Sequence, residues 1–147
     1  MRIYNGLNMK FEIDVKCPGN ILAVEFISDK NSICVSLSDR SFQFFDAVSI
    51  MEKKNKHKFK RFPLPSTQKC LCYVQRKRTL FSAGTDGMVL AWVIDKIFEQ
   101  KDAMDDLSGE QPDKKKEQEK FREYLCENTP WFLGGAATCI IDLPNIE

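Results

Sequence analysis

Short apolar runs separated by polar turns recur along the chain in the same order twice. The two series cover residues 21–46 and 68–95, and each contains an apolar run, a polar turn, a second apolar run, another turn and a final apolar run. Aligning Asp39 with Asp86 also aligns Phe45 with Trp92, which gives a period of 47 residues. Short runs rich in Val, Ile, Phe and Trp between such turns are typical of strands. Each series therefore predicts three short antiparallel strands.

Further strands are predicted on either side of these series. Residues 56–64, KHKFKRFPL, alternate between polar and apolar types and end at a proline, as an outer edge strand does. Residues 7–15 alternate in the same way and would form the outer strand of a preceding unit. After the second series, residues 131–133 predict the next outer strand, and residues 137–143 predict the next inner strand.

Residues 95–128 interrupt the strand pattern. Two short helical stretches fit the spacing of apolar residues, 96–107 and 112–126, whereas residues 110–120 hold no apolar anchor apart from Pro112 and are expected to be solvated or disordered. The stretch around Phe121, Tyr124 and Leu125 is a candidate partner helix or a segment that folds back on its own strands. We expect it to fold back.

The end of the second series, Leu80–Trp92 (LFSAGTDGMVLAW), resembles the end of a repeat in the WD-repeat family of β-propellers. The resemblance implies four-stranded antiparallel blades around a central channel. It also places Ser82, Asp86 and Trp92 in the hydrogen-bonded network that ties the turn of a blade to its strands. The histidine that completes this network in many members has no counterpart, because residues 64–66 are Leu, Pro and Ser.

The first series is a more divergent copy of the same pattern. It keeps Asp39, but Val35 and Phe45 stand where the hydroxyl and the tryptophan would be. Divergent copies, a repeat end reading SDRSFQFFD and a long charged insertion are similar to the large WD-repeat proteins of cilia and other cytoskeletal assemblies.

These observations predict an all-β fold, a partial β-propeller with a charged and partly helical insertion. Residues 1–20 are expected to be an outer strand of a preceding blade and a linker. Residues 21–64 and 65–95 are two WD-like blades, the second with three inner strands; 96–129 is the insertion, and 130–147 is an outer strand and the start of a next blade.

A closed propeller needs at least about four blades. With a period of 47, the 147 residues supply two full blades and parts of two others. We therefore expect a piece of a larger polypeptide, or a chain whose missing blades come from another chain.

The charge distribution is uneven, although the net charge is only +1. Residues 1–52, 53–85 and 86–147 carry −2, +10 and −7. The basic segment is either a solvated edge strand that lysines protect from aggregation, or a contact with an acidic surface such as an acidic protein tail, a tubulin lattice or nucleic acid. Nucleic acid is disfavoured because the segment lacks a stacking platform. The candidate contact residues are Lys53, Lys54, Lys56, Lys58, Lys60 and Arg61.

The position of the two longest links supports a contact surface. Residues 47–55 and 96–129 both connect a third strand to a fourth strand, so both links would lie on the same face of the propeller. Long loops on one face of a rigid scaffold are common partner sites.

Cysteine and histidine usage limits the chemistry. Cys70 and Cys72 would share one face of a strand, and with Cys34 and Cys139 they are conceivable zinc ligands. Their spacing does not fit a zinc knuckle and the single histidine, His57, lies in another strand, so we expect reduced and packed thiols. Gly134-Gly135 suggests a turn rather than a phosphate cradle, because an apolar strand and not a helix follows it.

No nucleophile–base–acid set, secretion signal or membrane-spanning apolar stretch is present in the sequence. The sequence therefore predicts a non-catalytic scaffold without cofactor or metal, located in the cytoplasm and cytoskeleton, with the ciliary axoneme as the favoured site. Its expected partners are proteins of a large complex, such as tubulin or axonemal proteins, and further blades, but neither nucleic acid nor membrane. The alternative is a substrate-receptor or signalling adaptor that binds a short peptide at the channel mouth.

Overall fold

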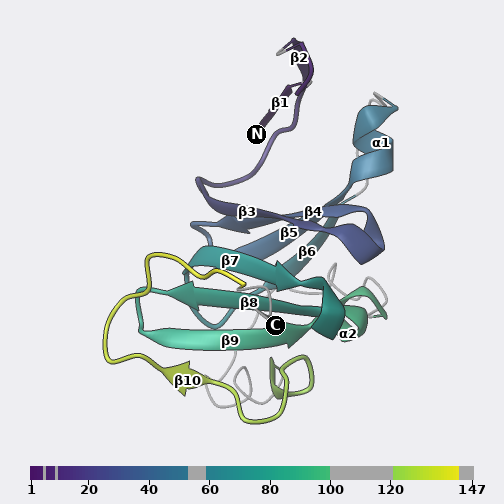
Figure 1. Ribbon diagram of the computed structural model, residues 1–147. Helices are drawn as coiled ribbons and strands as arrows, with labels where there is room; N and C mark the ends of the chain where they lie inside the picture. Colours follow the sequence, from purple (N-terminus) through teal and green to yellow (C-terminus); the bar gives the residue numbers. More distant parts are fainter. Residues whose placement is uncertain (5, 9, 53–58, 100–120, 143–147) are drawn as a thin grey trace, which may run out of the picture.

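The computed structural model describes residues 1–4, 6–8, 10–52, 59–99 and 121–142, which form a mostly β structure with antiparallel sheets. Two four-stranded sheets each run up and down in chain order (Figure 1). The first sheet contains β3 (Ile21–Ile27), β4 (Ser32–Leu37), β5 (Ser41–Asp46) and β6 (Phe59–Pro63). The second sheet contains β7 (Gln68–Val74), β8 (Thr79–Gly84), β9 (Met88–Val93) and β10 (Trp131–Phe132).

The predicted 47-residue period is confirmed in the strands. The strands β3, β4 and β5 begin and end 47 residues before β7, β8 and β9. The turns repeat as well: Asn31 and Arg78 both adopt the left-handed region after the 3-10 turns η1 (Ser28–Lys30) and η2 (Gln75–Lys77). Arg40 and Gly87, with φ of 60° and 73°, occupy the second turn of each series.

The outer strands take the predicted positions. The β6 strand pairs with β5, and β10 pairs with β9 although residues 94–130 separate them in the chain. An equivalent hydrogen bond fixes the end of the fourth strand in both sheets. The amide of Leu64 donates to the carbonyl of Arg40, and that of Leu133 donates to the carbonyl of Gly87, both at 2.8 Å.

The amino-terminal segment is a hairpin rather than a single strand. Its strands are β1 (Arg2–Tyr4) and β2 (Phe11–Asp14), which form a separate two-stranded sheet. The prediction of one strand over residues 7–15 is therefore wrong at its start. Leu7 and Asn8 lie in a turn, and the side chain of Asn8 accepts from the Lys10 amide at 2.9 Å, which stops the extended pattern.

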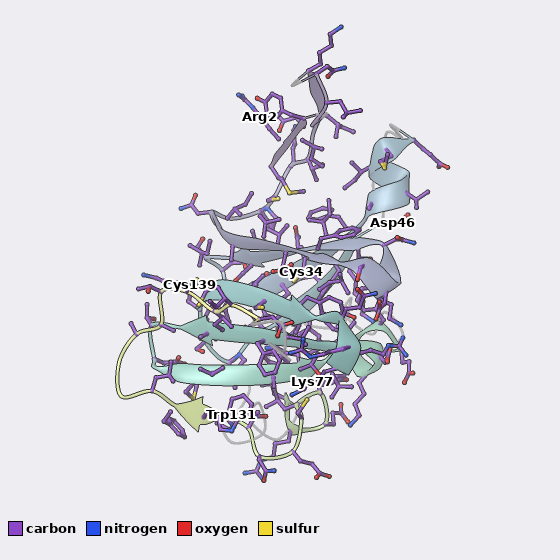
Figure 2. All side chains as sticks on the ribbon, viewed as in Figure 1. Arg2, Cys34, Asp46, Lys77, Trp131 and Cys139 are labelled. Carbon is purple, nitrogen blue, oxygen red and sulfur yellow. The ribbon has the colours of Figure 1, made fainter. Side chains whose placement is uncertain are left out.

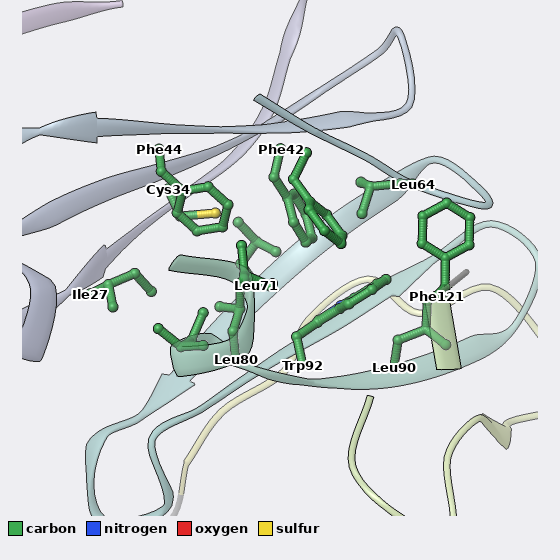
Figure 3. Close-up of a cluster of buried hydrophobic side chains, with 13 residues drawn as sticks. Ile27, Cys34, Phe42, Phe44, Leu64, Leu71, Leu80, Leu90, Trp92 and Phe121 are labelled. Carbon is green, nitrogen blue, oxygen red and sulfur yellow. The ribbon is translucent and has the colours of Figure 1, made fainter. Parts of the chain in front are cut away.

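The two sheets pack face to face through an aromatic core (Figure 3). Alternate side chains of each strand point into this core, as the two-residue period of a strand requires. Phe42 and Phe62 of the first sheet contact Trp92 of the second sheet edge to face, with ring centroids 5.8 and 5.7 Å apart. The edge strands β3 and β7 make the most extensive contact between the two sheets.

Two short helices and a returning segment fill the space beside the later strands. The helix α1 (Ala47–Met51) follows β5, and α2 (Ile94–Glu99) follows β9. Phe121 is buried in the central core, and Phe121 and Tyr124 contact Phe62 with centroids 6.2 and 5.1 Å apart. The expectation that this stretch folds back on its own strands is confirmed. Of the predicted helices, the second shows only a short helical turn at 121–122 within the described residues, and 100–120 lie outside them.

The carboxy-terminal segment crosses the far face of the second sheet. Residues 137–142 carry no strand assignment, so the predicted inner strand over 137–143 is not formed as a ladder within the described residues. A strand needs a neighbour to supply its hydrogen bonds, and this segment lies against a sheet face rather than along a sheet edge. Ala137 and Ile140 pack on Cys70 and Ala83, and the carboxylate of Asp142 pairs with Arg76.

Candidate functional site

A buried tryptophan links two strands of the second sheet. The Trp92 side chain is 0% exposed, and its indole nitrogen donates a hydrogen bond to the hydroxyl of Ser82 at 2.8 Å. Both side chains point into the core between the sheets, because Leu80 pairs with Trp92 and Ser82 pairs with Leu90 on the same face of the ladder. A polar pair therefore sits inside an otherwise apolar core with its donor satisfied.

The two turn aspartates bond locally. Asp86 accepts from the Met88 amide at 3.1 Å, and within the described residues no hydrogen bond joins its carboxylate to Ser82 or Trp92. Asp39, at the same place in the first sheet, accepts from the hydroxyl of Ser41 at 2.6 Å and from Arg61 at 2.8 Å. Each aspartate therefore closes its own turn, in the manner typical of Asp before a left-handed residue.

The basic segment is only partly described. Lys60 and Arg61 lie on β6, the edge strand of the first sheet, and Arg61 forms the ion pair with Asp39. Arg61 thus holds the turn of the first sheet while half of its side chain remains exposed. Four of the candidate contact residues fall outside the described residues: Lys53, Lys54, Lys56 and Lys58.

The links between strands gather at one end of the two sheets. In an up-and-down sheet, the first-to-second and third-to-fourth links leave at the same end, so η1, η2, α1 and α2 all lie at one end of the sheets. In Figure 1 this is the right-hand end, with α1 above the first sheet and α2 beside the second sheet. Asp46 caps α1 by accepting from the amides of Val48 and Ser49 at 3.3 and 3.2 Å. Figure 2 marks Asp46 where β5 runs into α1, and Lys77 in the second 3-10 turn. We call this end of the molecule the link face.

A network of charged side chains joins the two sheets at the link face. Asp95 at the start of α2 binds both Lys30 of η1, at 2.7 Å, and Arg78 after η2, at 3.0 Å. Asp29 accepts from the hydroxyl of Tyr73 at 2.8 Å and lies 3.6 Å from Arg78. The sequence analysis missed this network. The sequence contains one signal for this network, because charged residues occupy the same turn in both repeats.

The network changes two pKa values. The hydrogen bond from Lys30, opposed in part by burial and helped by the charges of Lys30 and Arg78, holds the pKa of Asp95 below its usual value. Burial, followed by the hydrogen bond to Asp29 and the charge of that carboxylate, raises the pKa of Tyr73 to about 12. Tyr73 therefore remains a protonated donor throughout the neutral range.

We expect the Asp95→Asn substitution to lower the free energy of unfolding by up to about 1 kcal/mol, because exposed ion pairs contribute this much at most. The lowered pKa of Asp95 sets the sign of the pH effect. Its stabilisation is complete above the ordinary pKa of an aspartate and is lost as pH falls through the lowered value. Urea unfolding at low and high salt measures the loss, which should shrink in high salt. Asp14→Asn, an exposed control, should change stability less, and an equal loss would contradict the role of the network.

The cysteines do not gather into one site. All six thiols are free, and Figure 2 shows Cys34 between the sheets and Cys139 on the carboxy-terminal segment. Burial raises the pKa of the thiols of Cys34, Cys70 and Cys72. Among the described residues, no group of three or more His, Cys, Asp or Glu side chains is placed to hold a metal ion.

Comparison with known proteins gives no family: no family model matches the chain, and no curated protein is significantly similar to it. In the described part of the chain, neither helix has the length and apolar character needed to cross a bilayer.

Proposed function

We propose that this chain is a non-catalytic scaffold, a segment of a WD-repeat-like propeller that presents protein-binding loops in a large cytoskeletal assembly. The observation that carries the proposal is the repeated four-stranded meander, stacked on its neighbour through an aromatic core, with α1 and α2, which begin the two long links, at the link face. The contact between the sheets is most extensive at β3 and β7, and Phe121 and Tyr124 fill the space between the later strands. Both observations support an arrangement in which the sheets fan out from a common axis.

The absence of a catalytic set in the sequence favours binding over chemistry. The chain has one histidine, and it has no pattern of the common nucleophile or phosphate-binding motifs. Rigid sheets that hold adjacent loops are suited to protein contacts, since the scaffold limits the conformational entropy lost on binding. The basic residues of the 47–55 link favour an acidic partner surface, and the lattice of tubulin is the partner that we propose.

Co-sedimentation with polymerised microtubules tests this function. The full chain is compared with a triple variant, Lys53→Gln, Lys54→Gln and Lys56→Gln. Removing three positive charges from one contact surface should weaken binding about tenfold at low ionic strength. A second triple variant, Lys10→Gln, Lys16→Gln and Lys69→Gln, removes the same charge elsewhere and should bind as the unmodified chain does. Equal weakening in both variants would show that only net charge matters, and absence of binding by the unmodified chain would rule out this partner.

A further inference from the structure

The outer strand of the first sheet, β6, has one edge that no other strand covers within the described residues. There, β6 pairs with β5 alone. The Leu64 amide donates to the carbonyl of Arg40, which makes Leu64 a hydrogen-bonded position of the ladder. Such positions alternate along an antiparallel strand, so Phe62 and Lys60 also direct their backbone groups toward β5. The N–H and C=O groups of Arg61 therefore point to the opposite side. We call this side the β6 edge.

Cationic side chains flank the β6 edge on both faces of the sheet. Successive residues of a strand point to opposite faces, so Lys60 and Arg61 lie on different faces. The Arg61 side chain binds Asp39 at 2.8 Å through one nitrogen and is 49% exposed, so further N–H donors of its guanidinium remain at the surface. In the sequence just before β6, residues 53–58 add four lysines and no acidic residue.

The equivalent strand of the second sheet has a different character. Only two residues of β10 pair with β9, and Pro130 comes directly before them. Residues 129–136 contain no charged side chain. Short length and proline are themselves sufficient to stop an edge from recruiting another strand. The β6 strand has five residues, which is long enough to accept a partner strand, and its cations determine which strand can be added.

The charges of the β6 edge select against most strands. Like charges opposite each other destabilise a strand pair, whereas opposite charges stabilise it. A basic strand or a second copy of β6 is therefore excluded, and an acidic strand is favoured. Because Lys60 and Arg61 lie on different faces, the added strand needs carboxylates at successive positions rather than at alternate ones. A flexible segment with a run of Glu or Asp has this pattern.

We propose that the β6 edge binds an acidic, flexible segment of a partner protein, which adds to the first sheet as a fifth strand. This inference rests on the proposed scaffold function, and on a microtubule the segment is the acidic carboxy-terminal tail of tubulin. Main-chain hydrogen bonds to Arg61 fix the register of the segment, and its carboxylates pair with Lys60 and Arg61. The charges provide specificity and speed the encounter.

Two labelled peptides of equal charge test strand addition. One has four Glu-Glu-Ala repeats and the other four Glu-Glu-Pro repeats, so the second lacks backbone N–H groups that a ladder needs. Fluorescence anisotropy with the full chain should show that the alanine peptide binds at least about fivefold more tightly. Hydrogen exchange followed by NMR should show new protection of the Arg61 amide. Equal affinity of the two peptides, or an Arg61 amide that stays unprotected, would overturn the proposal.

Variants of the chain test the charges. The double variant Lys60→Gln and Arg61→Gln should bind the alanine peptide at least about tenfold more weakly. Asp39→Asn is the matched control, because it removes the same ion pair with Arg61 but keeps both cations. This control should bind at least as tightly as the unmodified chain. A matching loss of affinity in Asp39→Asn would assign the effect to the turn of the first sheet and contradict a direct role of the cations.

Microtubules treated with subtilisin, which removes the tubulin tails, separate this proposal from the proposed function. At low ionic strength the full chain should bind them at least about tenfold more weakly than intact microtubules. Equal binding to both would overturn strand addition and leave the scaffold function in place. If the chain binds the alanine peptide as expected but does not bind intact microtubules, tubulin is excluded as the partner while the acidic-strand site at β6 stands.

Discussion

The Trp92→Ala substitution is expected to lower the free energy of unfolding by about 4 kcal/mol, a large part of the stability of a domain this size. The side chain is fully buried, and its ring meets Phe42, Phe62 and Phe121 edge to face. Truncation removes these contacts, leaves a cavity between the sheets and deprives the Ser82 hydroxyl of its donor. Urea unfolding followed by far-ultraviolet circular dichroism measures the loss without relying on the deleted fluorophore.

Two further variants separate the contributions at this position. Trp92→Phe keeps an aromatic ring but loses the hydrogen bond, so its cost should fall clearly below that of Trp92→Ala. Trp131→Ala removes the other tryptophan, which is 45% exposed and stacks on Phe81 at the surface, and it should cost less than about 1 kcal/mol. Comparable losses for Trp92→Ala and Trp131→Ala would contradict the central place of Trp92 in the core.

The Gly84→Ala substitution should destabilise the protein by about 3 kcal/mol or more, although it adds a single methyl group. A Cβ atom at Gly84 would overlap the backbone carbonyl of Thr67, which belongs to the chain that enters β7. A backbone atom cannot move aside as a flexible side chain can, so the start of β7 must shift away from β8. Thermal and urea unfolding of the purified variant measure the effect.

Gly135→Ala provides the control for this prediction. No atom lies within 4 Å of the position that a Cβ would take at Gly135, and its φ is not in the left-handed region. The control should therefore unfold as the unmodified protein does. If Gly84→Ala also unfolded like the unmodified protein, the close approach of Thr67 to β8 would be wrong.

The inner strands were predictable because two independent signals agree on them. Alternating apolar residues and turn residues mark each strand, and the 47-residue period marks the same boundaries a second time. The edge strand β10 was predictable from the apolar run at Trp131, even though only two of its residues pair. Propensity and repetition together therefore located the eight strands of the two sheets.

Other elements were missed for identifiable reasons. β1 has three residues and too short a pattern to stand out from a polar terminus. Helix α1 has five residues, and its signal is the capping side chain of Asp46 rather than a helical period. The extended segment 137–142 has the side-chain alternation of a strand, but sequence pattern cannot report whether a neighbouring strand is present.

The contacts of the candidate site were likewise predictable only in part. The Trp92–Ser82 contact joins residues that the resemblance to the WD-repeat family had already grouped, whereas the ion pairs of Asp95 with Lys30 and Arg78 join two 3-10 turns to the start of α2. Charged turn residues are common on any surface, so their convergence becomes visible only when the two sheets are stacked.

The up-and-down strand order also bears on how the chain is synthesised. Every strand of the first sheet lies within residues 21–63, so a ribosome releases that sheet before the second one exists. Until β7–β9 follow, the aromatic face that holds Phe42, Phe44 and Phe62 has no cover. Nascent chains that stall after Pro63 should therefore expose this face, and the need for a chaperone should be greatest from the release of Pro63 until Val93, the end of β9, has emerged.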